Sequence, residues 1–199
     1  MLNFDQNMLS GTIPGELFLL PIVQEISLSS NQLVGPLPAE VAAASNLKVL
    51  RVDDNQFGGE ISRDLGGATS LTSLDLSSNE YTKEIPTELF RLTRLETLNL
   101  ESNRLLSGRI PTEFGLFTDL QSLSISDTNI RARIPSEYAA LTKLTDLRMS
   151  NTLVGGNIPE EVQSLQEVVT IDLGDSRFRQ TIPSILGNFR NMSECACAW

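Results

Sequence analysis

Residues 26–38 read ISLSSNQLVGPLP, and this stretch decides how the rest of the chain is interpreted. It contains an apolar pair, Ile26 and Leu28, then Asn31, and then the step Leu37–Pro38. The same spacing returns about every 24 residues along the chain. A period of about 20–29 residues with this apolar pattern predicts a solenoid, in which each coil buries the apolar edge of the next.

The repeat can be followed from one end of the chain to the other. Asn31 corresponds to Asn7, Asn55, Asn79 and Asn103 in other coils. One step is longer, about 25 residues, and Leu106 is its apparent insertion. Later coils place Thr128, Thr152 and Ser176 at the same position, and every one of these polar residues follows an apolar pair: Leu2/Phe4, Ile26/Leu28, Leu50/Val52, Leu74/Leu76, Leu98/Leu100, Leu123/Ile125, Leu147/Met149 and Ile171/Leu173.

Each apolar pair predicts a short parallel strand whose alternate side chains point inward. The Asn that follows is expected to bond backbone groups of the turn and the adjacent coil, less completely where Thr or Ser replaces it. Next, a Gly lies where a Cβ is expected to be too bulky for a tight turn, although Lys83, Ala132 and Gln180 break this rule. The following Pro, replaced once by Ser62, is expected to open a short helical turn, and Glu in its first turn offsets the helix dipole.

Composition agrees with a solenoid and excludes several functions. Apolar residues form 40% of the 199 residues and aromatic residues only 6%, which suits a narrow aliphatic core. The net charge of −10 disfavours a nucleic-acid partner, and no apolar run is long enough for direct membrane insertion. The sequence contains no His and no Gly-rich phosphate loop, so we expect no catalytic residue, no metal site and no cofactor.

We expect residues 1–199 to form one solenoid domain of about eight repeats and a partial ninth. The first coil has no polar cap before it, so we expect the native chain to be longer. The repeat places Cys195 and Cys197 in the ninth strand. Core thiols are the favoured interpretation, with an intermolecular disulfide or an artefact of a truncated end as alternatives.

These coils resemble the plant-type leucine-rich repeat, most clearly in LTSLDLSSNEYTKEIP and LQSLSISDTNIRARIP. The resemblance implies an α/β fold, a right-handed solenoid with a parallel β-sheet on its concave face and short 3-10 turns on its convex side. Proteins of this type commonly serve as extracellular ectodomains of receptor-like proteins and receptor-like kinases, or as inhibitors of polygalacturonases. The resemblance therefore implies an extracellular or secreted location, although a cytoplasmic one stays open.

The predicted concave face is polar and acidic and contains no aromatic residue, so a basic protein or peptide fits it better than a neutral glycan. A solvated sheet without a ligand is the alternative. Charged residues interrupt every column of Ser and Thr, which disfavours ice binding. The candidate ligand-binding residues are Arg51, Asp53, Asp75, Asn99, Glu101, Asp146, Arg148 and Asp172.

We therefore predict a non-catalytic module that recognises a protein or peptide, with a co-receptor as a possible second partner. A free-standing inhibitor of a secreted wall-degrading hydrolase and a structural spacer are the alternatives. The triplet Asn191-Met192-Ser193 is a glycosylation sequon and makes Asn191 a possible glycosylation site.

Overall fold

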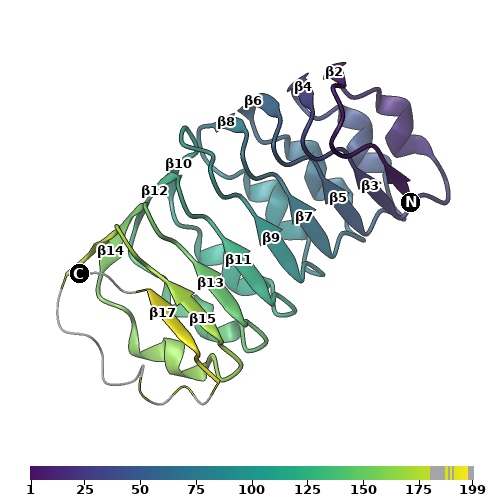
Figure 1. The fold of residues 1–199 in the computed structure, drawn as a ribbon. Coiled ribbons are helices and arrows are strands. Elements are labelled where there is room, and N and C mark those ends of the chain that lie inside the picture. The colour runs from purple at the N-terminus through teal and green to yellow at the C-terminus, as the bar shows by residue number, and fades with distance from the viewer. Residues whose placement is uncertain (180–186, 188, 190, 197–199) are drawn as a thin grey trace.

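The computed structural model describes residues 1–179, 187, 189 and 191–196 and confirms the predicted fold class. The chain winds into a right-handed solenoid with a parallel sheet on one face and 3-10 helices on the other (Figure 1). The sheet orders its strands as they occur in the chain: β1 (Leu2–Asn3), β3 (Glu25–Ser27), β5 (Val49–Arg51), β7 (Ser73–Asp75), β9 (Thr97–Asn99), β11 (Ser122–Ser124), β13 (Asp146–Arg148), β15 (Thr170–Asp172) and β17 (Glu194–Ala196).

The strand register follows the sequence repeat. Leu50 pairs with Leu74 and Leu74 with Leu98, so equivalent residues of consecutive coils lie side by side. At the end of the sheet, β17 pairs with β15 and sets Cys195 opposite Ile171, as the repeat predicts. Cys197 and the side chain of Cys195, as well as Gln180 and Pro183, lie outside the described residues, so the prediction of core thiols stays a prediction.

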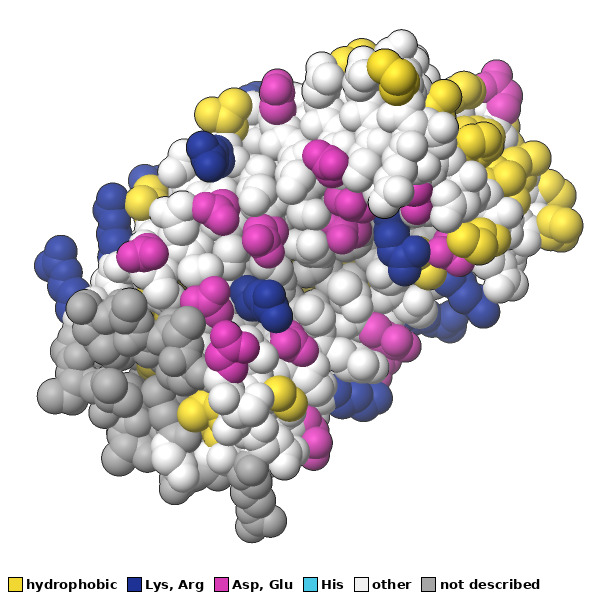
Figure 2. All heavy atoms as spheres, viewed as in Figure 1, with side chains coloured by type: hydrophobic (Ala, Val, Ile, Leu, Met, Phe, Trp, Pro, Cys, Tyr) yellow, Lys and Arg dark blue, Asp and Glu magenta, His cyan; other side chains and the backbone are white. Residues whose placement is uncertain are grey.

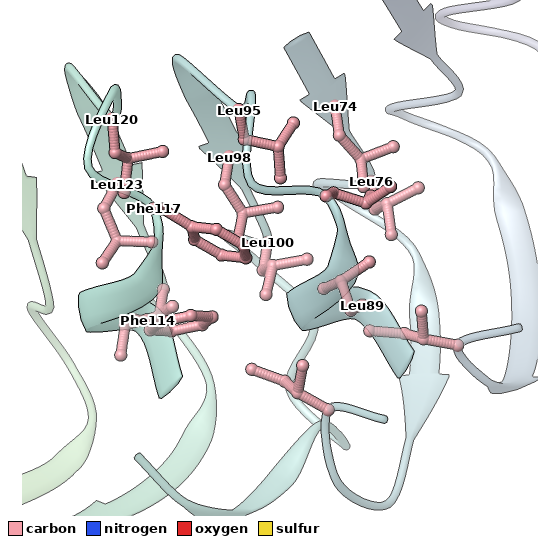
Figure 3. Packing of buried hydrophobic residues seen from close by; sticks show 14 of the residues in the cluster. Leu74, Leu76, Leu89, Leu95, Leu98, Leu100, Phe114, Phe117, Leu120 and Leu123 are labelled. Atoms are coloured by element: carbon pink, nitrogen blue, oxygen red, sulfur yellow. The ribbon is translucent and has the colours of Figure 1, made fainter. Parts of the chain in front are cut away.

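The core is a continuous ribbon of side chains between the sheet and the 3-10 helices. Leu74, Leu98 and Leu123 from consecutive strands stack in it (Figure 3) and are fully buried. Opposite them, Phe114 packs against Phe117 with ring centroids 5.8 Å apart. Because identical slots stack on each other, most of the apolar surface of a coil is covered by its two neighbours.

The insertion in the longer coil is Leu105 rather than Leu106. Leu106 is fully buried, and its carbonyl accepts the N–H of Asn129 in the next coil. The carbonyl of Leu9, at the equivalent position of the first coil, accepts the N–H of Gln32 in the same way. Leu105 is 58% exposed. The prediction of Leu106 as the insertion was wrong because two adjacent leucines compete for one core slot, and only the three-dimensional packing distinguishes them.

A second set of short parallel strands, which the sequence analysis missed, follows the main sheet in each coil. Between β8 and β10 this flank is reduced to a single bridge, Lys83 with Leu106, because the extra residue lies there. It therefore consists of two sheets, the first containing β2 (Ser10–Gly11), β4 (Gln32–Gly35), β6 (Gln56–Glu60) and β8 (Glu80–Thr82), and the second β10 (Ser107–Arg109), β12 (Asn129–Ala132), β14 (Leu153–Gly156) and β16 (Arg177–Phe178).

The 3-10 helices begin where the prolines predict. Within the described residues, Pro is the N-cap of each five-residue 3-10 helix except η3 (Arg63–Gly67). There Ser62 replaces it, and Ser62 Oγ accepts the N–H of Asp64. Ser is a favoured N-cap residue for this reason. The helices are η1 (Gly15–Leu19), η2 (Ala39–Ala43), η3 (Arg63–Gly67), η4 (Thr87–Arg91), η5 (Thr112–Leu116), η6 (Ser136–Ala140) and η7 (Glu160–Ser164).

The Asn after each main strand joins two coils. Asn79 is buried, and its Oδ1 accepts the N–H of Phe57 in the preceding coil at 3.0 Å. Its Nδ2 donates to the carbonyl oxygen of Val52 in that coil and to those of Leu76 and Ser77 in its own. One side chain therefore satisfies four backbone groups in the interior, as predicted for this position.

Thr128 takes the Asn position directly after the longer coil. The N–H of Leu106, which would need an acceptor from this side chain, donates instead to the carbonyl of Asn103 in its own coil. Thr128 Oγ1 donates to the carbonyl of Ile125 at 2.7 Å. The inserted residue thus removes the demand for a side-chain acceptor at Thr128.

The described glycines at this repeat position all have positive φ, and at Gly59 this backbone conformation, rather than lack of space, is what requires Gly. Gly59 has φ +81°, and an added Cβ would meet no atom within 4 Å. The two exceptions within the described residues, Lys83 and Ala132, also have positive φ, 63° and 100°. The predicted steric reason was therefore wrong at Gly59, since the left-handed region itself is what disfavours a side chain there.

We expect Ala132→Gly to raise the free energy of unfolding by about 0.5–1 kcal/mol, because it relieves a strained φ of 100°. The matched control Gly59→Ala should lower it by about 1 kcal/mol, because it introduces the same strain. Urea unfolding monitored by circular dichroism measures both. Loss of stability in Ala132→Gly would show that the methyl contact with the core outweighs the strain.

Candidate ligand-binding face

The predicted site residues lie on the concave sheet in two groups. Arg51, Asp53, Asp75, Asn99 and Glu101 lie on or directly after β5, β7 and β9. Asp146, Arg148 and Asp172 lie on β13 and β15, and the intervening β11 carries Ser122 and Ser124 instead of charged residues. Figure 2 shows acidic side chains spread over this face with few basic ones between them.

Asp53 is the most perturbed carboxylate of the first group. Burial raises its pKa, with smaller upward contributions from Asp75 and Asp5, and a hydrogen bond from Ser29 opposes the shift. Ser29 Oγ donates to Asp53 Oδ1, while the N–H of Ser29 donates to Asp5 Oδ1 at 2.8 Å. Ser29 therefore holds two carboxylates from coils on either side of it, and both remain partly accessible.

Asp75 and Glu101 extend the row along the sheet. Asp75 Oδ2 accepts Nδ2 of Asn99 at 3.1 Å, and Asp75 Oδ1 accepts the hydroxyl of Ser77. Glu101 Oε2 accepts Ser124 Oγ at 2.9 Å from the next strand. These bonds orient the carboxylates without neutralising them, so their negative charges remain available to a ligand.

Arg51 is already paired within the face. Its Nη1 lies 2.9 Å from Oε1 of Glu25 on the neighbouring strand, and both side chains are half-buried. Glu25, which the candidate set omitted, therefore belongs to the same charged face. With Glu25 and Asp5 added, the first group has one Arg against five carboxylates, those of Asp5, Glu25, Asp53, Asp75 and Glu101.

The second group is closer to neutral. Arg148 is exposed and lies 3.7 Å from Asp146 Oδ1 on the same strand, and the strand register sets it beside Asp172. Asp172 Oδ1 accepts the N–H of Gly174, two residues later. The structure therefore does not bring the eight candidates into one cluster, and it concentrates negative charge in the first group.

Several Ser and Thr residues on or next to the main strands are buried. Ser27 is completely buried beneath Asp5, to which its hydroxyl donates, and Ser126 and Thr170 are also buried. Neighbouring side chains on a curved sheet crowd toward one another and cover short ones. The sequence analysis did not identify Ser29 and Ser77 as hydrogen-bond donors to the carboxylates of Asp53 and Asp75. Their position directly after an apolar pair would have indicated that they lie on this face.

The remaining features concern metal ligands, membrane spans and the sequon in the described part of the chain. The structure places no three His, Cys, Asp or Glu side chains there close enough to hold a metal ion. None of its described helices combines the length and the hydrophobicity required to span a bilayer. Asn191 is exposed, and its Nδ2 lies 3.5 Å from Glu167 Oε2.

Comparison with known proteins identifies the architecture. The leucine-rich-repeat family model matches residues 45–105 and 69–130. A plant peptide hormone receptor, RGFR1 in complex with RGF2, superposes with a TM-score of 0.91 at 32% identity over 96% of this chain. This chain is a leucine-rich-repeat solenoid similar to the plant type. No curated protein matches it significantly.

Two further structures resemble the solenoid. The Arabidopsis receptor kinase HAESA, in complex with the peptide hormone IDA and the co-receptor SERK1, gives a TM-score of 0.89 at 32% identity over 97% of this chain. The solenoid spans about 30% of the RGFR1 chain and 32% of the HAESA chain, so it corresponds to part of either one. A plant ice-binding protein, of which it covers 80%, matches at 24% identity with a TM-score of 0.67, which shows the fold alone.

Proposed function

We propose that the solenoid is a non-catalytic recognition module that binds a basic peptide on its concave face, around Asp53, Asp75 and Glu101. The observation that carries this proposal is the row of carboxylates in the first group. A single Arg, Arg51, is the only cation in that group, so the row keeps a net negative charge. RGFR1 and HAESA were solved with peptide hormones, which favours recognition of a peptide over the inhibitor and spacer alternatives.

The electrostatics of Asp53 indicate what the peptide should carry. Its pKa is raised because it is partly desolvated and lies near Asp75 and Asp5. A Lys or Arg side chain of a bound peptide would relieve this repulsion. Complementary charge of this kind gives specificity and fast association.

We extend the proposal to the setting of the module. We propose that residues 1–199 form one solenoid domain and that this domain is extracellular. We also propose that Asn191 is glycosylated and that a co-receptor takes part in binding. The co-receptor SERK1 in the HAESA complex supports the last of these. Asp146, Arg148 and Asp172 would contact a more distant part of the same ligand.

The test is binding of a fluorescent peptide that alternates lysine with serine. The variant Asp53→Asn/Asp75→Asn/Glu101→Gln keeps the side-chain shapes and should weaken binding about tenfold, since each lost charge contact contributes about 0.2–1 kcal/mol. The control Glu40→Gln/Glu160→Gln/Glu161→Gln removes as much charge from the 3-10 helices and should leave affinity within about twofold. Equal losses in both variants would mean that net charge, and not this face, attracts the peptide.

A further inference from the structure

The flank that carries the second sheet has a charge opposite to that of the concave face. Within the described part of β10, β12, β14 and β16 no residue is acidic, whereas Arg109, Arg131 and Arg177 all lie on these strands. Arg133 and Arg179 directly follow β12 and β16, and Arg104 lies three residues before β10. We call this set the arginine flank: Arg104, Arg109, Arg131, Arg133, Arg177 and Arg179, all of which are exposed.

These arginines are not neutralised by the protein itself. None of the ion pairs formed by the described residues includes a member of the arginine flank; those pairs use Arg51, Arg63, Lys83, Lys143 and Arg148. In a chain of net charge −10, six of the fifteen basic residues are therefore gathered without partners on one flank. Figure 2 shows basic side chains along this edge of the molecule, over β10, β12 and β14.

The strand register brings like charges together. Arg109 on β10 pairs directly with Arg131 on β12, and adjacent strands lie about 4.8 Å apart. Like charges directly opposite each other on neighbouring strands repel. An anionic group placed between the two guanidinium groups would satisfy both at once, because a guanidinium presents several N–H donors in one plane.

A glycine leaves room for an arginine side chain to lie against the backbone of the flank. An added Cβ at Gly156 would lie 2.9 Å from Cγ of Arg133, so the stem of Arg133 lies across this Gly of the next strand. Next to it, Arg109 and Arg133 border a hollow of about 520 Å³ that also contains Ile110, Ala132, Ile134 and Pro135. Glu137 lines the same hollow, and Glu84 lies across Gly108 at its border.

We propose that the arginine flank is a second docking surface, distinct from the concave face, for an acidic peptide segment of a partner protein. Charge complementarity selects an anionic partner. The apolar floor between arginines selects one that also carries apolar side chains, as protein interfaces combine Arg with buried apolar contacts. The hollow is lined by no aromatic side chain on which a base or a sugar ring would stack, which disfavours nucleic acids and polysaccharides.

The test uses the 199-residue protein and a fluorescent peptide that alternates glutamate with leucine, with a glutamine-leucine peptide as the uncharged control. The variant Arg109→Glu/Arg131→Glu should weaken binding of the acidic peptide at least about tenfold, because two attractions become two repulsions. The matched variant Arg91→Glu/Arg94→Glu changes net charge equally at exposed positions outside the flank and should leave affinity within about twofold. Circular dichroism verifies that each variant is folded. If Arg109→Glu/Arg131→Glu does not fold, Arg131→Gln replaces it in the binding measurement.

The proposal would be overturned by no binding of the acidic peptide, by equal binding of the glutamine peptide, or by equal losses in both double variants. Polygalacturonate that competes as well as the acidic peptide at equal carboxylate concentration would also overturn it, because the flank would then be a general polyanion surface. The lysine-serine peptide reports on the concave face separately. Its binding should be unaffected or strengthened by Arg109→Glu/Arg131→Glu, so failure of one surface is distinguishable from failure of the other.

Discussion

Replacement of Asn79 by Leu is expected to lower the free energy of unfolding by about 3 kcal/mol, the largest single effect we expect in this chain. The substitution removes one acceptor and one donor group that together satisfy the N–H of Phe57 and the carbonyls of Val52, Leu76 and Ser77. Each buried polar group left without a partner costs about 1–3 kcal/mol, and partial relaxation of the turn reduces the total. Urea unfolding of the wild type and the variant measures the difference.

Asn7→Leu is the matched control. Asn7 occupies the same repeat position but is exposed, and its Nδ2 donates only to the carbonyls of Phe4 and Asp5 within its own coil. Water can replace those two bonds, so the control should cost less than about 1 kcal/mol. A similar loss in both variants would mean that the bonds between coils at Asn79 contribute little.

Alkaline pH is expected to destabilise the protein through two buried tyrosines. Tyr81 and Tyr138 are the two tyrosines of the chain, both are fully buried, and neither hydroxyl has a hydrogen-bond partner among the described residues. Burial raises the pKa of both phenols well above the usual value of 10. The folded protein therefore retains protons that the unfolded chain loses above about pH 10.

The sign of the effect follows from this proton release. Stability is unaffected by these groups below about pH 10, and above it the free energy of unfolding should fall by about 1.4 kcal/mol per pH unit for each tyrosine. Tyrosinate absorbance should appear together with unfolding, not before it. Tyrosinate formed near pH 10 in a chain that is still folded would contradict the burial of both phenols.

The double variant Tyr81→Phe/Tyr138→Phe should remove this part of the pH dependence. Its stability at pH 7 should be unchanged or higher by about 1 kcal/mol, since an unpaired buried hydroxyl is lost and the shape is kept. Phe is tolerated at both slots, because it occupies the equivalent position of the preceding coil in each case: Phe57 stacks on Tyr81, and Phe114 packs at a tilt against Tyr138. A large loss of stability at pH 7 would indicate that the hydroxyls are satisfied by water.

The repeat predicted the features that depend on position within a coil. Because equivalent residues such as Leu74 and Leu98 must stack for either to be buried, the period determined the parallel register and the core of the main sheet. The Asn position and the Pro that opens each 3-10 helix were predicted for the same reason, since each serves a local backbone need that recurs in every coil.

Tertiary structure decided what depends on contacts between columns of side chains and on backbone angles. Only the packing shows that Leu106, and not Leu105, fills the core position of its coil. Only the backbone angle φ shows that Ala132 is strained. The pairing of Arg51 with Glu25 depends on which side chains meet across a curved sheet. The arginine flank depends on a second sheet whose pattern is too short to be recognised in sequence, because its strands contain only two to five residues and little apolar alternation.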